Sequence, residues 1–188
     1  MSAPAARVRR VDPHRRERIL DAAIDVMAAR GVAGTTHRVI AAAADVPLGS
    51  LTYYFTGLDD LRAQAFARLA ERATRAYAAH FDGVRSAEDL VDAVTDLVHD
   101  AAGSRPDEWV VAYELYLAAL RDPALRSVTE AWMRASRGVL ERFVAPDVAR
   151  GLDALVEGLI MHRTLSTAPA SRDETRAAVR RALAPLPG

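Results

Sequence analysis

The 188-residue chain contains no cysteine and no lysine. The absence of cysteine excludes disulfide bonds and thiolate metal sites, and it is compatible with a reducing compartment. No uncharged apolar run reaches membrane-spanning length, and no apolar segment follows the arginines near the N-terminus. We therefore expect a cytoplasmic protein with neither a secretory signal nor a membrane association.

Arginine supplies all 25 basic side chains, a bias that we attribute to genomic base composition. The net charge of zero conceals an asymmetry, because residues 1–58 have a balance of +3 and residues 59–188 a balance of −3. Six arginines lie between Arg7 and Arg18. This basic N-terminal part fits a polyanionic partner, although charge alone is equally consistent with a solvated arginine-rich tail.

Apolar residues recur at helical spacing along almost the whole chain, and no segment has convincing strand periodicity. Capping residues and prolines mark where helices begin. The predicted fold is all-α, with about nine helices at residues 13–30, 36–44, 48–54, 58–81, 87–102, 106–121, 123–144, 146–165 and 172–184.

Residues 31–60 predict a helix-turn-helix. Thr36 is placed to cap the first short helix, residues 45–47 form the turn, and the second helix is too short to persist without packing. A short helix with small polar and aromatic side chains suits insertion into a DNA major groove. We assign the core of this head to Val39, Ile40, Val46, Leu51 and Phe55, and the apolar face of its first short helix to Val39, Ile40 and Ala43.

The predicted organisation has four parts. A flexible basic arm covers residues 1–12, and a DNA-binding domain covers residues 13–57. A ligand-binding and dimerisation domain covers residues 58–184, followed by a short tail at 185–188.

The head carries a specific set of residues: Arg30-Gly31, Thr35-Thr36, Ile40-Ala41, Ala44-Asp45-Val46, Gly49, Leu51, Tyr54-Phe55 and an acidic pair before Leu61. With these residues, the segment from about Arg15 to Leu61 resembles the TetR family of one-component transcriptional repressors. The resemblance implies a homodimer that binds a palindromic operator in double-stranded DNA. It also implies that a small-molecule effector bound in the body changes the spacing of the two heads, and it implies no catalysis and no cofactor.

The same resemblance implies the DNA contacts. Arg38 would reach base edges or phosphate, since a fork of donors suits guanine. Hydroxyls and helix N-terminal amides would hold phosphates. The full set of DNA-binding residues implied by position is Thr36, His37, Arg38, Leu48, Gly49, Ser50, Thr52, Tyr53, Tyr54 and Gly57.

Three residues depart from the family pattern. Asp45 stands where the family usually has glycine, and aspartate tolerates a left-handed backbone better than most residues. Thr52 replaces a common tyrosine, and Leu58 replaces a common lysine. Because the lysine contacts phosphate, the main alternative is a helical ligand-binding or scaffold homodimer that has lost DNA binding.

Aromatic side chains cluster in the predicted body. Trp109, Tyr113 and Tyr116 share a helical face, and a mostly apolar pocket with a few polar groups is typical of a small-molecule site. Ordinary core packing is the alternative for each residue. The predicted ligand-binding set is Tyr77, His99, Trp109, Tyr113, Glu114, Tyr116, Trp132 and Met133, in which Glu114 and His99 are the polar anchors.

The last two helices are predicted to form the dimer interface. Small residues on one side let helices approach closely, and the family pairs its last two helices between subunits. The set is Gly151, Leu155, Gly158, Leu159, His162, Val179 and Leu183. The alternative is that the two glycines serve helix crossings within one chain.

An enzymatic reading ranks a distant third. His80, the pair His99-Asp100, and Asp107 or Asp122 could supply the ligands of an all-helical metal phosphohydrolase, but the His80–His99 interval is short for that arrangement. No motif of a serine hydrolase, a phosphate-binding loop or a zinc protease appears, so we predict no metal site and no enzyme.

Overall fold

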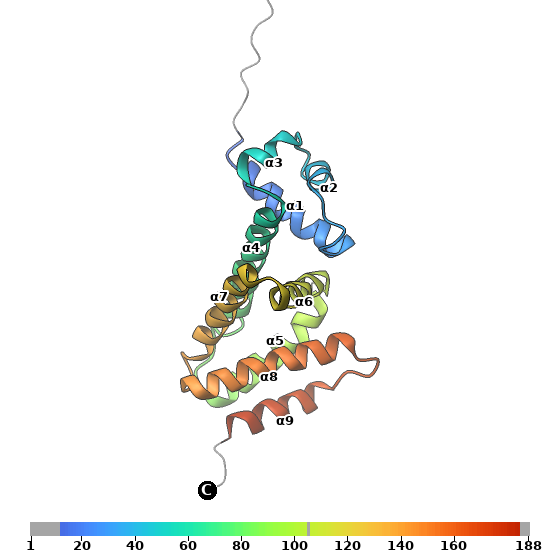
Figure 1. The fold of residues 1–188 in the computed structure, drawn as a ribbon. Coiled ribbons are helices and arrows are strands. Elements are labelled where there is room, and N and C mark those ends of the chain that lie inside the picture. The colour runs from blue at the N-terminus through green and yellow to red at the C-terminus, as the bar shows by residue number, and fades with distance from the viewer. Residues whose placement is uncertain (1–11, 105, 185–188) are drawn as a thin grey trace, which may run out of the picture.

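The computed structural model describes residues 12–104 and 106–184, without the side chains of 101–107. These residues form nine helices and no strand, as predicted (Figure 1). No helix among them combines the length and the apolar character needed to cross a membrane. The bounds are α1 Arg15–Arg30, α2 His37–Ala43, α3 Gly49–Tyr54, α4 Leu58–Ala79, α5 Ala87–Ser104, α6 Pro106–Arg121, α7 Pro123–Leu140, α8 Pro146–Leu165 and α9 Arg172–Leu183.

Local signals define the head of α1, α2 and α3. The Thr36 hydroxyl caps α2 by accepting a hydrogen bond from the Val39 amide at 3.3 Å. Asp45 adopts φ +51°, the only positive φ of a non-glycine residue in the described chain. The turn therefore has the left-handed residue that glycine usually supplies, and the expectation that aspartate tolerates it is confirmed.

The predicted head core needs one correction. Ile40, Leu51 and Phe55 are buried, and Val46 is partly buried and packs against the same cluster, but Val39 is only partly buried and is not among the residues packed against it. The side of α2 that packs inward consists of Ile40, Ala41 and the capping residue Ala44, whereas Ala43 is exposed. The short helix is rotated relative to the predicted face because its contacts come mainly from α1 on one side.

Two helices end earlier than predicted. The long helix expected to reach residue 81 ends at Ala79, and the one expected to reach 144 ends at Leu140. In both places the next residues form tight turns, with the Phe81 amide donating to the Ala78 carbonyl and the Phe143 amide to the Leu140 carbonyl. Their rings then pack inward, with ring centroids 6.0 Å apart.

The helix α4 descends from the head into the body (Figure 1). Its buried side chains belong to a cluster that includes the head core and continues into α6 and α7. A second cluster occupies the far end, where α5, α8 and α9 pack with Phe81 and the end of α7. The apolar core thus continues across the predicted boundary between the DNA-binding domain, which ends at residue 57, and the body, which begins at residue 58. That boundary stays a prediction.

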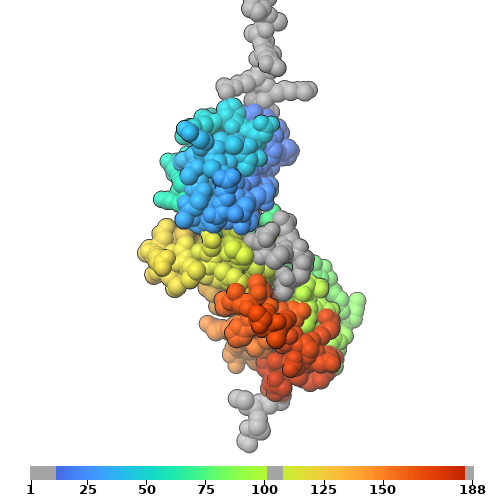
Figure 2. Space-filling view, turned by 90° about the vertical axis from the view of Figure 1, so that its right-hand side faces the viewer, coloured from blue at the N-terminus to red at the C-terminus, as the bar shows by residue number. Residues whose placement is uncertain are grey.

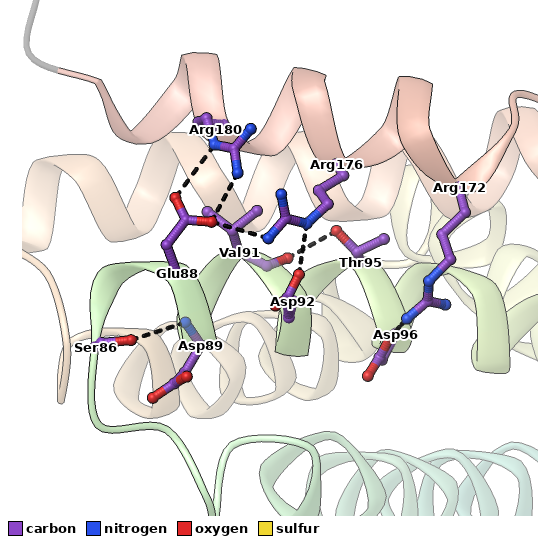
Figure 3. A network of polar contacts seen from close by, with 10 residues as sticks. All are labelled: Ser86, Glu88, Asp89, Val91, Asp92, Thr95, Asp96, Arg172, Arg176 and Arg180. Carbon is purple, nitrogen blue, oxygen red and sulfur yellow. Dashed lines mark hydrogen bonds and ion pairs between the residues drawn. The ribbon is translucent and has the colours of Figure 1, made fainter.

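An antiparallel ladder of ion pairs joins α5 to α9 (Figure 3). Residues spaced by four along each helix pair as Asp96 with Arg172, Asp92 with Arg176 at 2.6 Å, and Glu88 with Arg180 at 2.7 Å. The arginine partners lower the pKa of Glu88 and of Asp92. Ser171 and Glu174 form a capping box at the start of α9, which fixes where the ladder begins.

Candidate DNA-binding surface and effector cavity

The outer surface of α2 and α3 is open to solvent. Two large apolar side chains there are unusually exposed, with Tyr53 at 81% and Leu48 at 50%. Thr36, Arg38, Gly49 and Thr52 are also exposed, while His37, Ser50, Tyr54 and Gly57 are partly buried. All ten residues of the predicted DNA-binding set thus keep at least part of their surface accessible.

The two adjacent tyrosines point in different directions, because neighbouring positions of a helix lie about 100° apart. Tyr54 packs against the head core, and Tyr53 projects from it, with their rings edge to face and 4.9 Å apart. Leu58, where lysine is common in the family, also packs against the core. Tyr53 is therefore the aromatic residue that an external partner can contact.

The loop between α1 and α2 is held by side chains from two other helices. Arg62 of α4 donates to the carbonyls of Val32 and Thr35, both at 2.9 Å. Glu114 of α6 accepts a hydrogen bond from the Val32 amide at 2.5 Å. A Cβ atom placed on Gly31, which has φ +72°, would lie 3.1 Å from the Glu114 carboxylate. The head is therefore fixed to α6 as well as to α4.

A second set of ion pairs crosses the same junction. Arg68 of α4 makes a two-pronged contact with Asp21 of α1, at 2.7 and 2.8 Å. Arg72, one turn further along α4, pairs with Glu108 of α6 and lies 3.8 Å from Asp21. Figure 2 shows the end of α6 and the start of α7, in yellow, directly against the blue head.

A cavity of about 180 Å³ lies below this junction, between α4, α5, α6, α7 and α8. Aromatic and apolar side chains make up most of its wall, and four carboxylates interrupt it. The lining residues are Leu69, Ala73, Ala76, Tyr77, His80, Leu97, Asp100, Glu108, Trp109, Ala112, Trp132, Ser136, Asp153, Val156, Glu157 and Ile160. Such a wall suits an organic molecule that carries positive charge.

Three of the four carboxylates have basic partners. The Asp100 carboxylate lies 3.5 Å from Nε2 of His80, and Glu108 pairs with Arg72 as described above. Asp153, which is buried, accepts a hydrogen bond from the Ser136 hydroxyl at 2.7 Å and one from Arg137 Nε at 3.1 Å.

The fourth carboxylate, Glu157, differs from the others. The phenol of Tyr116 donates to its Oε1 at 3.3 Å, and the described residues place no basic side chain in a salt bridge with it. Burial and the nearby negative charge of Asp153 raise the pKa of Glu157 to about 7. Burial also raises the pKa of Tyr77, whose hydroxyl is buried and makes no hydrogen bond within the described part of the chain.

The cavity wall includes three residues of the predicted ligand-binding set: Tyr77, Trp109 and Trp132. Tyr113 and Tyr116 lie behind it, and ring centroids are 6.0 Å apart in both pairs: Tyr116 stacks on Trp132, and Tyr113 is tilted against Trp109. They support the wall instead of forming it.

Three other members of that set lie elsewhere. Met133 does not line the cavity, and its sulfur accepts a contact from Arg137 at 3.7 Å. His99 lies between α5 and α9, where its Nε2 is 3.1 Å from the Thr175 hydroxyl. Glu114 contacts the head instead of the cavity. Neither predicted polar anchor is part of the wall, because each points from its helix toward a different neighbour.

Asp153 and Glu157 line the cavity but are not among the ligand-binding residues predicted from the sequence. Both lie one turn apart on α8 among Leu152, Val156 and Ile160, which are buried. A pair of acids at that spacing on the apolar side of a helix was the available signal, because acidic side chains are rarely buried without a reason.

The predicted dimer residues divide between surface and core. Val179 is fully buried against the body of its own chain, so it is corrected to a core residue. Leu155, Leu159 and Leu183 are partly buried beside the same core, and His162 is exposed.

The glycines of α8 leave open space outside the helix. Apart from the neighbouring residues and the backbone of α8 itself, no described atom lies within 4 Å of a Cβ placed on Gly151 or Gly158, so neither serves a close crossing with another helix of the described chain. With the exposed side chains of Met161 and Leu165, they form a surface strip of small and apolar residues along α8.

Of the residues considered for a metal site, His80 and Asp100 lie together in the cavity wall, and two of the others point elsewhere. His99 contacts Thr175 and Asp122 caps α7, while the side chain of Asp107 lies outside the described residues. Among the described residues, no group of three or more His, Asp or Glu could hold a metal ion.

Both parts of the chain match family models. Residues 19–65 match the model of bacterial regulatory proteins of the TetR family, and residues 85–185 match the tetracycline repressor-like C-terminal domain. A search among curated proteins finds no match.

Solved structures with the same fold cover almost the whole chain. SCO7518 from Streptomyces coelicolor A3(2), described as a transcriptional regulator, is 43% identical, with a TM-score of 0.87 over 90% of this chain and 98% of its own. The multidrug binding protein EbrR in complex with ethidium is 38% identical, with a TM-score of 0.74 over 92% and 100% of the two chains. The TetR-family member SCO1917 from Streptomyces coelicolor A3 is 35% identical, with a TM-score of 0.76 over 90% and 98%. The head, the helical body and these matches together show that the chain belongs to the TetR family of transcriptional regulators.

Proposed function

We propose that the protein is a homodimeric repressor that binds a palindromic operator and leaves it when an organic cation enters the cavity. The observation that carries this proposal is the position of α6, which lines the cavity with Trp109 and Ala112 and contacts the head through Glu114. As a regulator without catalytic activity, it would act on DNA in the cytoplasm.

The head supplies the groups that DNA binding needs. Arg38 at the start of α2 and Tyr53 on α3 are both exposed. An arginine fork reads guanine or holds phosphate, and hydroxyls with helix N-terminal amides set the register on the backbone. Two heads in one dimer would contact successive major grooves, about 34 Å apart.

A mobility-shift titration against the DNA upstream of the protein's own coding region tests this part. The wild type should give a discrete shift that resists nonspecific competitor. Arg38→Ala and Tyr53→Ala should each weaken it by about 1–3 kcal/mol, roughly five- to 150-fold at matched salt. Arg134→Ala, an exposed arginine of α7, is the control and should bind as the wild type does.

The protein could be a folded dimer that gives no specific mobility shift and selects no site in a genome-wide binding selection. That result would favour the alternative, a ligand-binding homodimer that has lost DNA binding. Loss of thermal stability in Tyr53→Ala, instead of loss of affinity, would return Tyr53 to a packing role. Its 81% exposure argues against that role.

The ligand class follows from the cavity wall and from a relative. Tyr77, Trp109 and Trp132 offer aromatic faces, and carboxylates lie beside them. Aromatic faces and carboxylates both attract cations. The relative EbrR has been solved with ethidium, proflavin and malachite green. We infer that the effector of this chain is an organic cation with apolar groups.

Two contacts would transmit ligand binding to the head, and both pass through α6. Glu108 on the cavity wall pairs with Arg72, which also lies near Asp21 of α1. Glu114, two turns along the same helix, accepts from the Val32 amide. A ligand that shifts α6 would change both contacts together. For release, the ligand must bind the DNA-incompetent arrangement more tightly than the competent one.

The homodimer would form along α8 and α9. The open strip at Gly151, Gly158, Met161 and Leu165 of α8 offers a face that a second copy could cover. Isologous pairing of this strip would join four helices, two from each subunit.

A further inference from the structure

One carboxylate of the cavity lacks the kind of partner that the other three have. Asp100, Glu108 and Asp153 each lie against a histidine or an arginine. Glu157 has the Tyr116 phenol as its hydrogen-bond partner, and no basic side chain of the described residues pairs with it. Glu157 is partly buried in the cavity wall. A carboxylate withdrawn from water is costly without a positive partner, so the missing charge points to a ligand.

Among the described residues, the surroundings of Glu157 contain no compensating charge. From its own helix, Asp153 faces it, and this residue is already paired with Arg137. From α6, Tyr113 and Tyr116 lie beside it, and Tyr77 approaches from α4. All of these groups are acidic or neutral at neutral pH.

The other titratable groups of the wall each have a partner of their own. His80 and Asp100 face each other, and Glu108 is held by Arg72. His80 is the one histidine among the described residues of the wall.

We propose that Glu157 is the residue that selects positively charged ligands in this cavity, and that its carboxyl group releases a proton as the cation binds. The proposal rests on the function proposed above in one respect: it takes this cavity as the effector site. The neutral carboxylic acid and the cation are the reactants. The products are a carboxylate–cation pair and one proton, which passes to the solvent.

Proton release follows from the energetics of the empty site. Burial and the charge of Asp153 raise the pKa of Glu157 to about 7, so at pH 7 about half of the empty sites carry the proton. A cation in contact with the carboxylate favours the ionised form and lowers that pKa. Affinity for a fixed cation should therefore increase as the pH rises through 7 and level off above it, with a change of about tenfold between pH 6 and pH 8.

Ethidium is a suitable probe, because its quaternary nitrogen keeps its charge at every pH and only the protein titrates. We would measure its binding to the full-length dimer by calorimetry, without DNA, at pH 6, 7 and 8. Titrations at pH 7 in phosphate and in Tris, which differ in ionisation enthalpy, give the number of protons released. The wild type should release about half a proton at pH 7 and bind about tenfold more tightly at pH 8 than at pH 6.

Glu157→Gln keeps the size of the side chain and removes its charge. At pH 8 this variant should bind ethidium about ten- to a hundredfold more weakly, and it should release no proton. Glu130→Gln, an exposed acid of α7, is the matched control and should behave as the wild type does. Nile red, a neutral apolar dye, should bind Glu157→Gln and the wild type equally, which shows that the cavity is intact.

Three results would overturn the proposal. Ethidium could bind Glu157→Gln with wild-type affinity, or fail to bind the wild type at all. A pH dependence that survives in Glu157→Gln would assign the proton to another group, such as His80. None of these results depends on DNA. If the protein shifts an operator but does not bind ethidium, only the inference about Glu157 is overturned. If ethidium binding depends on Glu157 but no operator is found, the inference about Glu157 stands and the repressor proposal is wrong.

Discussion

Replacing Glu114 by alanine should uncouple the cavity from the head. The Glu114 carboxylate accepts the Val32 amide at 2.5 Å, and the adjacent Gly31 leaves just enough room for it. A hydrogen bond from a backbone amide to a charged group contributes about 1.5–3 kcal/mol. If ligand binding breaks this hydrogen bond, its free energy is the most that the contact can contribute to the coupling between ligand and operator. That limit corresponds to a change of roughly 12- to 150-fold in operator affinity.

The measurement is operator affinity with and without saturating tetraphenylphosphonium, a permanently charged cation that does not intercalate into DNA. Fluorescence anisotropy at fixed salt gives the ratio of the two dissociation constants. We expect Glu114→Ala to reduce that ratio by about tenfold or more, and Glu114→Gln, which keeps a neutral acceptor, to fall between alanine and wild type. Glu130→Ala on the exposed side of α7 is the control.

Coupling free energies between binding equilibria are reciprocal, which gives an internal check. Operator DNA must change the affinity for tetraphenylphosphonium by the same factor in each variant. If Glu114→Ala remains folded at the assay temperature and keeps the full wild-type ratio, the contact with Val32 does not transmit the signal. The Glu108–Arg72 pair would then be the route to test.

Three further predictions concern stability and assembly. Because Asp45 has φ +51°, Asp45→Ala should destabilise the fold by about 1 kcal/mol in urea denaturation and Asp45→Gly should not; equal losses would show that the turn does not depend on that backbone angle. Gly158→Arg should give a folded monomer by light scattering, whereas Gly138→Arg, at an equally open glycine of α7, should leave the dimer intact; a dimeric Gly158→Arg would remove α8 from the interface. Glu88 and Asp92 have lowered pKa values in the folded protein, so the stability that they add is present above their ordinary pKa values of 4.5 and 3.8 and is lost as the pH falls below these values. Amide hydrogen exchange in α9, corrected for its intrinsic pH dependence, should therefore become faster in this acidic range and should not change between pH 6 and 8.

The sequence predicted the elements whose causes are local. Apolar spacing and capping residues are properties of neighbouring positions, so nine helices, the cap at Thr36 and the unusual aspartate of the turn could all be derived without a structure. The head motif is equally local, and it carried the resemblance to the family. Adjacent helical positions point in different directions, so Tyr53 and Tyr54 could not both face the core, and only the structure showed that Tyr53 is the exposed one.

The walls of the cavity required the tertiary structure. Along α6, Trp109 lines the cavity, Tyr113 packs against Trp109 at a tilt, and the next residue, Glu114, reaches the head. Adjacent positions on a helix point about 100° apart, and which neighbour each one meets depends on how the other helices pack around it. The same reason separates Glu157 from the three carboxylates with basic partners, because those partners come from α4 and α7, which are distant in sequence. The sequence alone therefore determined the helices, the head and the family, and only the packing of α4, α6, α7 and α8 decided which charges meet in the cavity and which carboxylate is left for a ligand.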